Sequence, residues 1–413
     1  MSRTRFRFSA LPRVVAVIAL LAVASWSQAS WAAAPKAAKA GKEPSKGVEK
    51  TEVKFVRVPD GGLQPQAAVD NEGTLHLVYL GDDPGAANIY YVRKGAGQEK
   101  FSRPICVNSQ SGSAIAVGSI RGAHLAIGKG QRVHVAWNGS GTAEPRGPKK
   151  YDSPMLYTRL ADDGNSFEPQ RSVNGEKYGL DGGGSVAADL EGNVYVAWHG
   201  GDGSGEQNRR VFVVKSTDEG KSFAPDVTAD KDKNGACGCC GLRAFADRQG
   251  TLYLLYRGAR DMNNRDMFLL TSGDGARSFD SLLADKWMVS RCPMSSEAFV
   301  DGRDAVMAAW ETDSQIYVSR IDKKKGREPS KPLAPTGKSG DRKHPAMAVN
   351  GQGETLLVWT EGTGWNKGGG LAWQLFNDKG RPTTTRGRLD KSIPVWSFAA
   401  VYAEPDDSFV ILH

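Results

Sequence analysis

The stretch that decides the fold reads Ser216-Thr217-Asp218-Glu219-Gly220-Lys221-Ser222-Phe223, and it returns as Ser272-Gly273-Asp274-Gly275-Ala276-Arg277-Ser278-Phe279. A weaker copy, Leu160-Ala161-Asp162-Asp163-Gly164-Asn165-Ser166-Phe167, precedes both, and successive phenylalanines are 56 residues apart. Repetition at a fixed period indicates a repeat architecture. Each copy follows an apolar run bounded by turn residues, so we predict that it joins two antiparallel strands.

The aspartates of these turns, Asp162, Asp218 and Asp274, are assigned a structural role. An Asp carboxylate can fold back onto the backbone N–H groups of its own turn, and Gly supplies a positive φ. The closing Phe then enters the core between strands. The motif is therefore predicted to be a clasp between strands and not a catalytic element.

A second pattern interleaves with the first, and it consists of a turn followed by a strand that ends in an aromatic residue. Its copies run from Gly73 to Tyr79, Gly130 to Trp137, Gly192 to Trp198, Gly250 to Tyr256, Asp304 to Trp310, Gly353 to Trp359, and Asp407 to the last residue, His413. The 49 to 61 residues between successive aromatics accommodate about four strands, which is the size of a propeller blade.

We therefore predict an all-β protein, a β-propeller of four-stranded blades. Seven blades are favoured, the last one a short pair of strands from about Phe398 to Leu412. The orphan strand Val53–Val58 is predicted to take the place of a fourth strand there and to close the ring, which removes open sheet edges. Six blades with extra end strands remain the alternative.

The Asp turns and the strand pattern resemble the Asp-box (BNR) repeats of the sialidase superfamily. The resemblance covers nearly all of the chain after residue 52 and implies a sialidase-like propeller. It implies no activity, because Asp boxes also occur in many propellers that are not glycosidases.

The first 32 residues have the pattern of a secretory signal peptide. Arg3, Arg5, Arg7 and Arg13 accompany a short apolar stretch from Val14 to Ala24, and Ser30-Trp31-Ala32 offers small residues for cleavage. Residues 33–51 form a linker of Ala, Lys, Pro and Gly, which leaves residues 52–413 for the propeller. The sequence thus predicts a periplasmic or secreted protein without a transmembrane segment after signal removal.

The formal net charge of +8 is concentrated before the propeller. The signal carries four Arg and no acid, and the linker carries five Lys against two Glu. Subtracting the net charge of +4 of the signal and of +3 of the linker leaves about +1 for residues 52–413. A basic nucleic-acid footprint is therefore absent, and we expect no nucleic-acid partner.

Four of the five cysteines gather at one predicted junction between blades. Cys237, Cys239 and Cys240 precede the first strand of one blade, and Cys292 precedes the first strand of the next. Equivalent positions on adjacent blades lie side by side, so Cys292 is expected to face the other three. Cys106 has no evident partner and is expected to be a small buried residue.

Three interpretations of this cluster stay open. A blade-to-blade disulfide is the simplest in an exported protein. A thiolate metal site is the second, with Met294 and His344 as further ligands and with copper or zinc as the metal. Free or redox-active thiols are the third. The spacing Cys-x-Cys-Cys differs from the usual Cys-x-x-Cys of zinc sites.

The same region carries a second resemblance. Cys-x-Cys-Cys, Arg257-Gly258-Ala259-Arg260-Asp261, Trp287 and Cys292-Pro293 look like a segment of secreted bacterial sialidase-like BNR proteins of undefined biochemical role. The resemblance covers about residues 234–310. That group often has His where this chain has Met294, and often has Arg directly after the double Cys, where this chain has Gly241 and Leu242.

The sialidase resemblance implies three arginines around a substrate carboxylate, a Tyr nucleophile paired with Glu, and an Asp acid/base. The first Arg belongs to an Arg-Ile-Pro motif, and this chain has Gly62-Leu63-Gln64-Pro65-Gln66 in that place. The Pro is present and the Arg is not, so the standard activity is not expected.

Several residues remain candidates for binding a glycan, a small anion or a protein partner. Guanidinium groups pair with carboxylates, and His and Glu serve acid–base roles. Candidate ligand-binding residues are Arg121, Arg243, Arg257, Arg260, Arg265 and His344, and candidate catalytic residues are Arg257, Arg260 and Glu297. Trp365 and Trp373 flank a Gly-rich loop and are candidates for stacking on a sugar.

Three hypotheses for function follow. The first is an exported propeller that binds a ligand, glycan or protein on the face that carries the cysteines and the arginine loop. The second is a sialidase-type glycoside hydrolase with an altered site. The third is a metal-binding or redox protein.

Overall fold

The computed structural model describes residues 51–413, apart from 151, 179, 181, 202–203 and 325–326. The predicted signal peptide 1–32 and all but the last residue of the predicted linker 33–51 lie outside the described residues.

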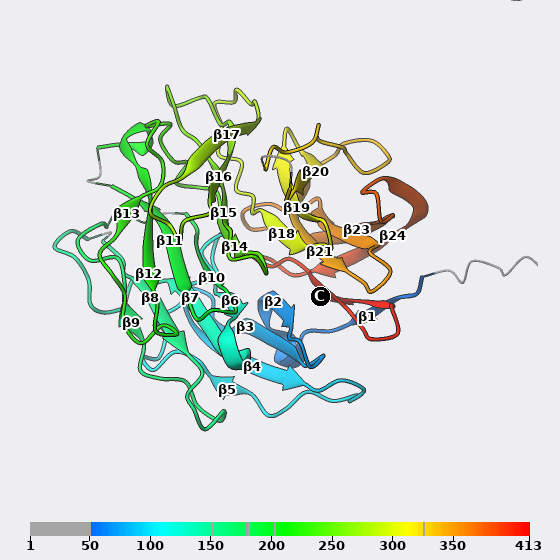
Figure 1. The fold of residues 1–413 in the computed structure, drawn as a ribbon, viewed down its shortest axis with the longest axis horizontal. Helices are drawn as coiled ribbons and strands as arrows, with labels where there is room; N and C mark the ends of the chain where they lie inside the picture. The colour runs from blue at the N-terminus through cyan, green and yellow to red at the C-terminus, as the bar shows by residue number, and fades with distance from the viewer. Residues whose placement is uncertain (1–50, 151, 179, 181, 202–203, 325–326) are drawn as a thin grey trace, which may run out of the picture. The chain divides into compact units, whose positions relative to one another are not determined.

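The described chain forms seven β-sheets that are arranged around a common centre like the blades of a propeller (Figure 1). Blade 1 consists of β2 (Leu63–Val69), β3 (Leu75–Asp83), β4 (Ala86–Lys94) and β5 (Ile105–Cys106), and blade 2 consists of β6 (His124–Ile127), β7 (Val133–Asn138), β8 (Met155–Arg159) and β9 (Arg171–Ser172). Blade 3 consists of β10 (Gly184–Ala188), β11 (Val194–Gly200), β12 (Arg210–Ser216) and β13 (Val227–Thr228). Blade 4 consists of β14 (Leu242–Ala246), β15 (Leu252–Arg257), β16 (Met267–Ser272) and β17 (Asp280–Asp285).

Blade 5 consists of β18 (Ala298–Asp301), β19 (Ala305–Thr312) and β20 (Gln315–Asp322). Blade 6 consists of β21 (Arg342–Val349), β22 (Thr355–Glu361), β23 (Gly369–Phe376) and β24 (Pro382–Ile393). Blade 7 consists of β25 (Ala400–Ala403), β26 (Phe409–Leu412) and β1 (Val53–Val56). Three short 3-10 turns complete the described elements: η1 (Pro59–Gly61), η2 (Lys129–Gln131) and η3 (Glu206–Asn208). In the described part of the chain, no helix has the length and apolar character needed to cross a membrane. The prediction of an all-β propeller with seven blades is confirmed.

The ring is closed by strands from the two ends of the described chain. β1 pairs in parallel with β26, from Val53 opposite Phe409 to Val56 opposite Leu412. The last blade is short, as predicted, but β1 does not take a fourth position. It lies third, directly beside β26, where it covers the edge of β26 that does not pair with β25.

Blade 5 also has three strands, which the sequence pattern did not indicate. Two isolated bridges, Val318 to Leu333 and Ile321 to Pro329, take the place of its outer strand. The segment carries Pro329, Pro332 and Pro335, and proline has no N–H to donate to a sheet.

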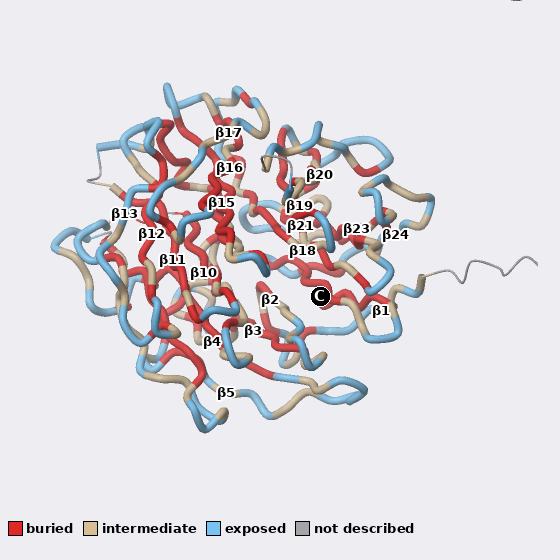
Figure 2. The backbone as a smooth tube through the Cα atoms, in the orientation of Figure 1, coloured by how far each residue is buried: buried red, intermediate tan, exposed pale blue. Residues whose placement is uncertain are grey.

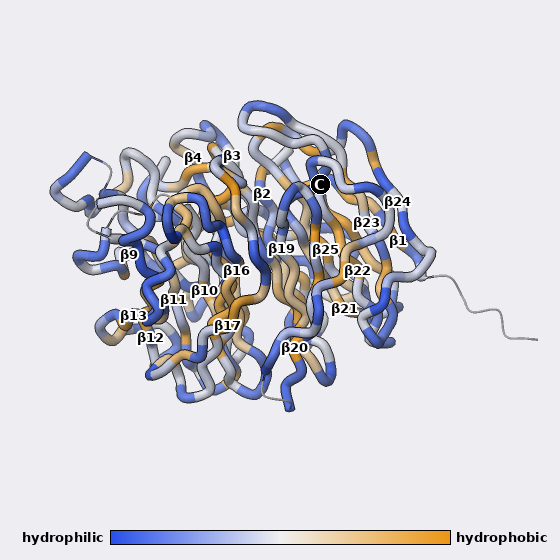
Figure 3. The backbone as a smooth tube through the Cα atoms, turned by 90° about the horizontal axis from the view of Figure 1, so that it is seen from above, coloured by the Kyte–Doolittle hydropathy of each residue, from blue (hydrophilic) through white to orange (hydrophobic). Residues whose placement is uncertain are grey.

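Aromatic residues at the ends of the second strands are buried, as the turn–strand pattern predicts. Trp137, Trp198 and Trp310 are all fully buried, and the indole N–H of Trp137 donates to the Ser113 carbonyl at 3.2 Å. Figure 2 shows that the second strands of the blades, such as β11 and β15, are buried and that most connecting loops are exposed, and Figure 3 shows apolar residues along the strands. The core is thus divided among the interfaces between blades.

The Asp turns at Asp218 and Asp274 are built as predicted. Asp274 Oδ1 accepts from the Ser278 N–H at 3.0 Å, and its Oδ2 accepts from the Ser278 hydroxyl at 2.6 Å. These hydrogen bonds hold the pKa of Asp274 well below its usual value. Asp218 makes the same two contacts with Ser222, at 2.9 and 2.6 Å.

The weaker copy differs from the prediction at Asp162. There the neighbouring Asp163 caps the turn, accepting from the Asn165 N–H at 2.8 Å, and Asp162 forms an ion pair with Arg132 at 2.5 Å. In the other two copies, a serine hydroxyl two residues before the aspartate donates a hydrogen bond to its carboxylate. The weaker copy has Leu160 in that position and lacks this donor.

The closing phenylalanines join neighbouring blades. The ring of Phe223 in blade 3 lies 4.9 Å from that of Tyr157 in blade 2, edge to face. Phe167 in blade 2 meets Tyr91 in blade 1 in the same way at 5.5 Å. Each turn therefore anchors its blade to the preceding one.

Replacing Phe409 tests the importance of ring closure. Phe409 is fully buried in β26 opposite Val53, so Phe409→Ala should lower the free energy of unfolding by about 3–5 kcal/mol. The control Val56→Ala removes a side chain of the same ladder that is 37% exposed, and should cost less than about 1 kcal/mol. Urea unfolding followed by tryptophan fluorescence measures both. Equal small losses would show that closure contributes little.

Candidate functional site

The residues at the starts of the inner strands surround a cavity of about 90 Å³ at one end of the central channel. Its polar lining comes from Gln64, Gln66, Ser119, His124, Arg243, Ser296 and Glu297. A wider cavity of about 620 Å³ opens at the other end. Both cavities are lined by Arg243 and Phe299, so they are parts of one channel that narrows toward the smaller cavity.

Arg243, the second residue of β14, is the cation of the small cavity. Its Nη1 donates to Gln66 Oε1 at 2.8 Å and to His124 Nδ1 at 3.3 Å. His124 Nδ1 also lies 2.8 Å from the Ser185 hydroxyl, and burial holds the pKa of His124 well below its usual value. Burial lowers the pKa of Arg243 to about 10, so it stays charged at neutral pH.

Glu297 lies one residue before β18 and is the acid of the same cavity. It is buried, its Oε2 has no hydrogen-bond partner, and a Cβ on Gly241 would come within 2.9 Å of that oxygen. Burial raises the pKa of Glu297 to about 8, against the opposing charge of Arg257. A pKa of about 8 leaves Glu297 largely protonated near pH 7, and the charge that it acquires at higher pH stabilises the Arg243 guanidinium.

The other predicted arginines are placed elsewhere. Arg257 is buried and donates from Nη1 to the Arg265 carbonyl at 2.6 Å and from Nη2 to the Glu311 carbonyl. Arg265 binds Glu206 Oε2 at 2.6 Å, and the exposed Arg260 forms ion pairs with nearby aspartates. Arg243 is the one predicted arginine that lines the small cavity among the described residues.

A second cavity of about 20 Å³ adjoins the first and shares Ser119 with it. It brings together Met294, His344 and Trp365 with Trp396 and two lysines, Lys343 and Lys367. His344 Nδ1 lies 3.1 Å from the Ser296 hydroxyl, and burial lowers the pKa of His344 to about 3.

Arg121 and Trp373 complete the predicted set. Arg121 Nη2 donates to the Val117 carbonyl at 3.4 Å, and a Cβ on Gly118 would touch both Arg121 and Trp365. Arg121 thus lies beside the second cavity. Trp373 is in β23, where its ring packs against Gly387 of β24, and it does not line either of the two cavities.

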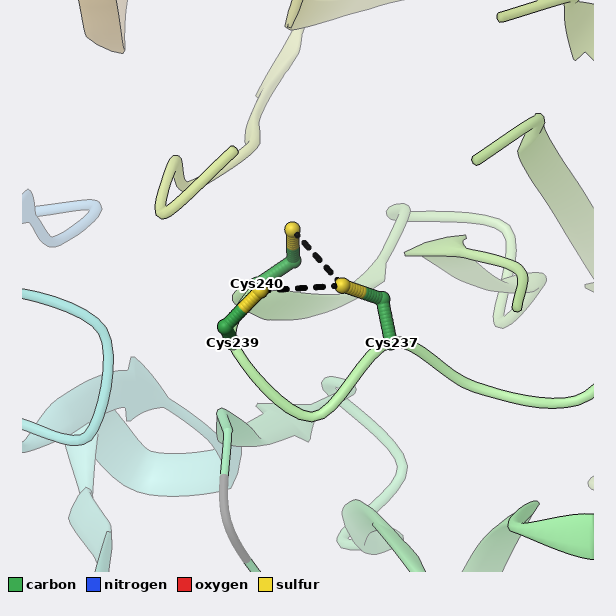
Figure 4. Close-up of side chains that lie close together, drawn as sticks. All are labelled: Cys237, Cys239 and Cys240. Carbon is green, nitrogen blue, oxygen red and sulfur yellow. Dashed lines mark hydrogen bonds between the residues drawn. The ribbon is translucent and has the colours of Figure 1, made fainter. Parts of the chain in front are cut away.

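The three cysteines of the loop before β14 converge, as Figure 4 shows. Cys237 Sγ lies 3.3 Å from Cys239 Sγ and 3.3 Å from Cys240 Sγ, well beyond the S–S bond length of about 2.05 Å. Hydrogen bonding with the other two thiols holds the pKa of Cys237 well below its usual value, and burial raises that of Cys240. The three thiols therefore form one hydrogen-bonded cluster.

The structure places Cys292 near this cluster, as the blade repeat predicts. Cys292 is exposed in the loop before β18 and contributes, after Cys237, to a raised pKa of Cys239. All five cysteines are unbridged thiols. The expectation for Cys106 is wrong: it is exposed, because β5 is the outer strand of blade 1 and one face of it meets solvent.

Sequence reasoning missed Gln66, His124 and Trp396. Gln66 and His124 stand near the starts of the inner strands of blades 1 and 2, in the same ring of positions as Arg243. Aligning the starts of all inner strands would have found them. Trp396 reaches the second cavity from the segment between blades 6 and 7, which carries no repeat signal.

Comparisons with known proteins bear on the fold alone. No protein-family model and no curated protein matches the chain. Similar solved structures include a Hadza microbial sialidase, with 14% identity over 78% of this chain and 70% of that one and a TM-score of 0.47. A protein of unknown function from Dyadobacter fermentans is 12% identical over 76% of this chain and 94% of that one, with a TM-score of 0.49. The NanB sialidase of Streptococcus pneumoniae is 13% identical over 86% of this chain and 66% of that one, with a TM-score of 0.46.

The protein is thus an all-β, seven-bladed propeller with a polar constriction in its channel. This class rests on the strand pairing of the chain itself. The likenesses to solved structures carry no argument about activity.

The buried carboxyl of Glu297 should make stability depend on pH. Its pKa of about 8 lies above the ordinary value of 4.5, so between these values the folded protein holds a proton that the unfolded chain releases. The free energy of unfolding should therefore fall as the pH rises from about 4.5 to about 8, by up to about 1.4 kcal/mol per pH unit, and level off above.

Urea unfolding at pH 5, 6, 7 and 8 measures this slope. Glu297→Gln removes this group and should make the slope between pH 6 and 8 shallower, whereas the buried Asp230, whose pKa burial raises to about 6, still contributes below pH 6. The control Glu328→Gln, at an exposed position, should leave the slope unchanged. A slope between pH 6 and 8 that is as steep in the Glu297→Gln variant as in the wild type would contradict the assignment.

Proposed function

We propose that this protein binds a small anionic ligand at the narrow end of its channel, through Arg243. One observation carries the proposal: the Arg243 guanidinium lines a cavity, and its hydrogen-bond partners are the neutral groups of Gln66 and His124. Among the described residues, Arg243 forms no ion pair within 4.0 Å, and Glu297 is the carboxyl group that acts on it electrostatically. A guanidinium in such a place pairs strongly with a carboxylate or sulfate.

Size and charge favour the anionic head of a ligand. A cavity of about 90 Å³ holds several waters, or a group as large as a carboxylate or sulfate with part of its substituent. Glu297 is protonated at neutral pH, so it does not repel an anion and can donate a hydrogen bond to it. Both neighbours of the anion would therefore be donors.

The surface around the adjoining cavity suits the remainder of an acidic sugar, while the cavity itself, at about 20 Å³, has room for about one water. Trp365 is 47% exposed there, beside Trp396, and Lys343 and Lys367 add positive charge. Indole rings offer a flat apolar surface for a sugar ring, and their N–H groups offer donors. An acidic saccharide is therefore the ligand class that the two cavities favour together.

Sialidase-type hydrolysis is the second candidate, and the geometry favours it less. Arg257 and Arg260 are engaged outside the cavity, and no tyrosine is among the described residues that line the two cavities. Glu297 is a neutral acid at pH 7, which suits proton donation and not nucleophilic attack.

Export is part of the proposal and rests on the sequence of residues 1–32. The mature chain is expected to begin near Ala33. Intact mass of the protein recovered from the periplasm or medium tests this, and a chain that keeps its first 32 residues would contradict it.

Ligand binding is tested by calorimetry with sulfate, acetate, glucuronate and N-acetylneuraminate as probes. Arg243→Gln should weaken binding of at least one sugar acid by tenfold or more, because the guanidinium–carboxylate pair is lost. Arg260→Gln, an exposed arginine, is the matched control and should bind as the wild type does. Circular dichroism checks that both variants fold.

Two results would overturn the binding proposal. One is equal affinity of wild type and the Arg243→Gln variant for every probe. The other is turnover of a fluorogenic sialoside that is lost in the Arg257→Gln variant, which would place hydrolysis at a different group of residues.

A further inference from the structure

We propose that Cys237, Cys239 and Cys240 form a binding site for one copper(I) ion. The site lies at the junction of blades 3, 4 and 5 and is separate from the anion site. Among the described His, Cys, Asp and Glu residues, these three form the group in which all potential ligand atoms lie within 4.8 Å of one another. Figure 4 shows their side chains directed toward one another from a single loop.

The loop is held in the conformation that gathers the sulfurs. Cys237 N–H donates to the Arg257 carbonyl at 2.9 Å, and the Gly238 N–H donates to Glu206 Oε1 at 2.7 Å. The Cys240 carbonyl accepts from the Gly183 N–H at 3.1 Å. The backbone is thus fixed to strands of two blades before any ion binds, which reduces the ordering that binding requires.

The surroundings suit a soft, weakly hydrated cation. Cys237 and Cys240 are almost fully buried and pack with Ala259, so two of the three sulfurs face an apolar wall. Cys239 is partly exposed and lies near Cys292, which is exposed on the next blade. An ion therefore has a route from solvent past Cys292 to the buried pair.

A buried cation beside the cluster supports an anionic metal–thiolate centre. Arg265 acts electrostatically on Cys237 and Cys239, and its Nε and Nη1 are buried without a hydrogen-bond partner. Three thiolates with Cu(I) carry a net charge of −2, so a neighbouring guanidinium lowers the cost of burying the complex.

The number of ligands favours copper(I) over zinc. Structural zinc sites take four protein ligands in a tetrahedron, while soft thiolates in a smaller set suit Cu(I). Of the further ligands predicted from the sequence, His344 bonds Ser296 and lines the second cavity with Met294. Cys292 lies near Cys239 but is not among the three sulfurs that all lie within 4.8 Å of one another. Only sulfur is available within the cluster.

The test is an anaerobic titration of the full mature chain, fully reduced, with Cu(I) in competition with bathocuproine disulfonate. We expect one equivalent bound, with sulfur as the only ligand atom by X-ray absorption. Cys237→Ser should weaken binding at least 100-fold. Cys106→Ser, an exposed thiol on blade 1, is the control and should bind as the wild type does.

Further variants guard against misfolding and keep the two proposals apart. Cys239→Ser changes the partly exposed member of the cluster, so it should fold normally by circular dichroism and still lose affinity. Arg243→Gln should bind copper normally whether or not it binds anions, because its side chain is not part of the cluster.

Three outcomes would overturn the copper site. The first is that the reduced protein binds less than half an equivalent of Cu(I), or that the cluster variants bind Cu(I) as tightly as the wild type does. The second is that zinc displaces Cu(I) and that zinc binding requires Cys292. The third is that the protein isolated from its own compartment is two hydrogens lighter than its reduced mass and holds no metal, which would identify a disulfide in the cluster.

Discussion

The parallel pairing of β1 with β26 is the constraint on which the rest of the structure depends. The small cavity takes residues from the inner strands of six of the seven blades, so it exists only when the ring is closed. Residues as distant in sequence as Gln66 and Arg243 meet across it at 2.8 Å. Because β1 and β26 come from opposite ends of the described chain, both the ring and the cavity form only when the whole domain is folded.

Within the closed ring, burial decides the electrostatics of the channel. It leaves Arg243 charged, with neutral partners, and it keeps Glu297 protonated because no hydrogen-bond donor satisfies the Oε2 of a carboxylate there. A cavity with one cation and one neutral acid attracts anions. The same pair exposed to water would be an ordinary Arg and an ionised Glu, with no such preference.

The start of β14 links this channel to the cysteine cluster. Cys240 is followed by Gly241, whose N–H donates to the Ser295 carbonyl at 2.9 Å and whose Cα lies against Glu297, and then by Leu242 and Arg243. A side chain at position 241 would collide with Glu297 Oε2. One short segment thus directs thiols toward one blade junction and a guanidinium into the channel.

The sequence by itself determined the propeller, favoured seven blades over six and placed Cys292 on the blade next to that of the other cysteines. These follow from repeats whose turns, at Asp218 and Asp274, are stabilised by contacts within eight residues. Only the tertiary structure decided which arginine faces the channel, that β1 lies third and parallel, and that Gln66, His124 and Trp396 join the site. Those outcomes depend on contacts between distant strands and on burial, which no local pattern in the chain encodes.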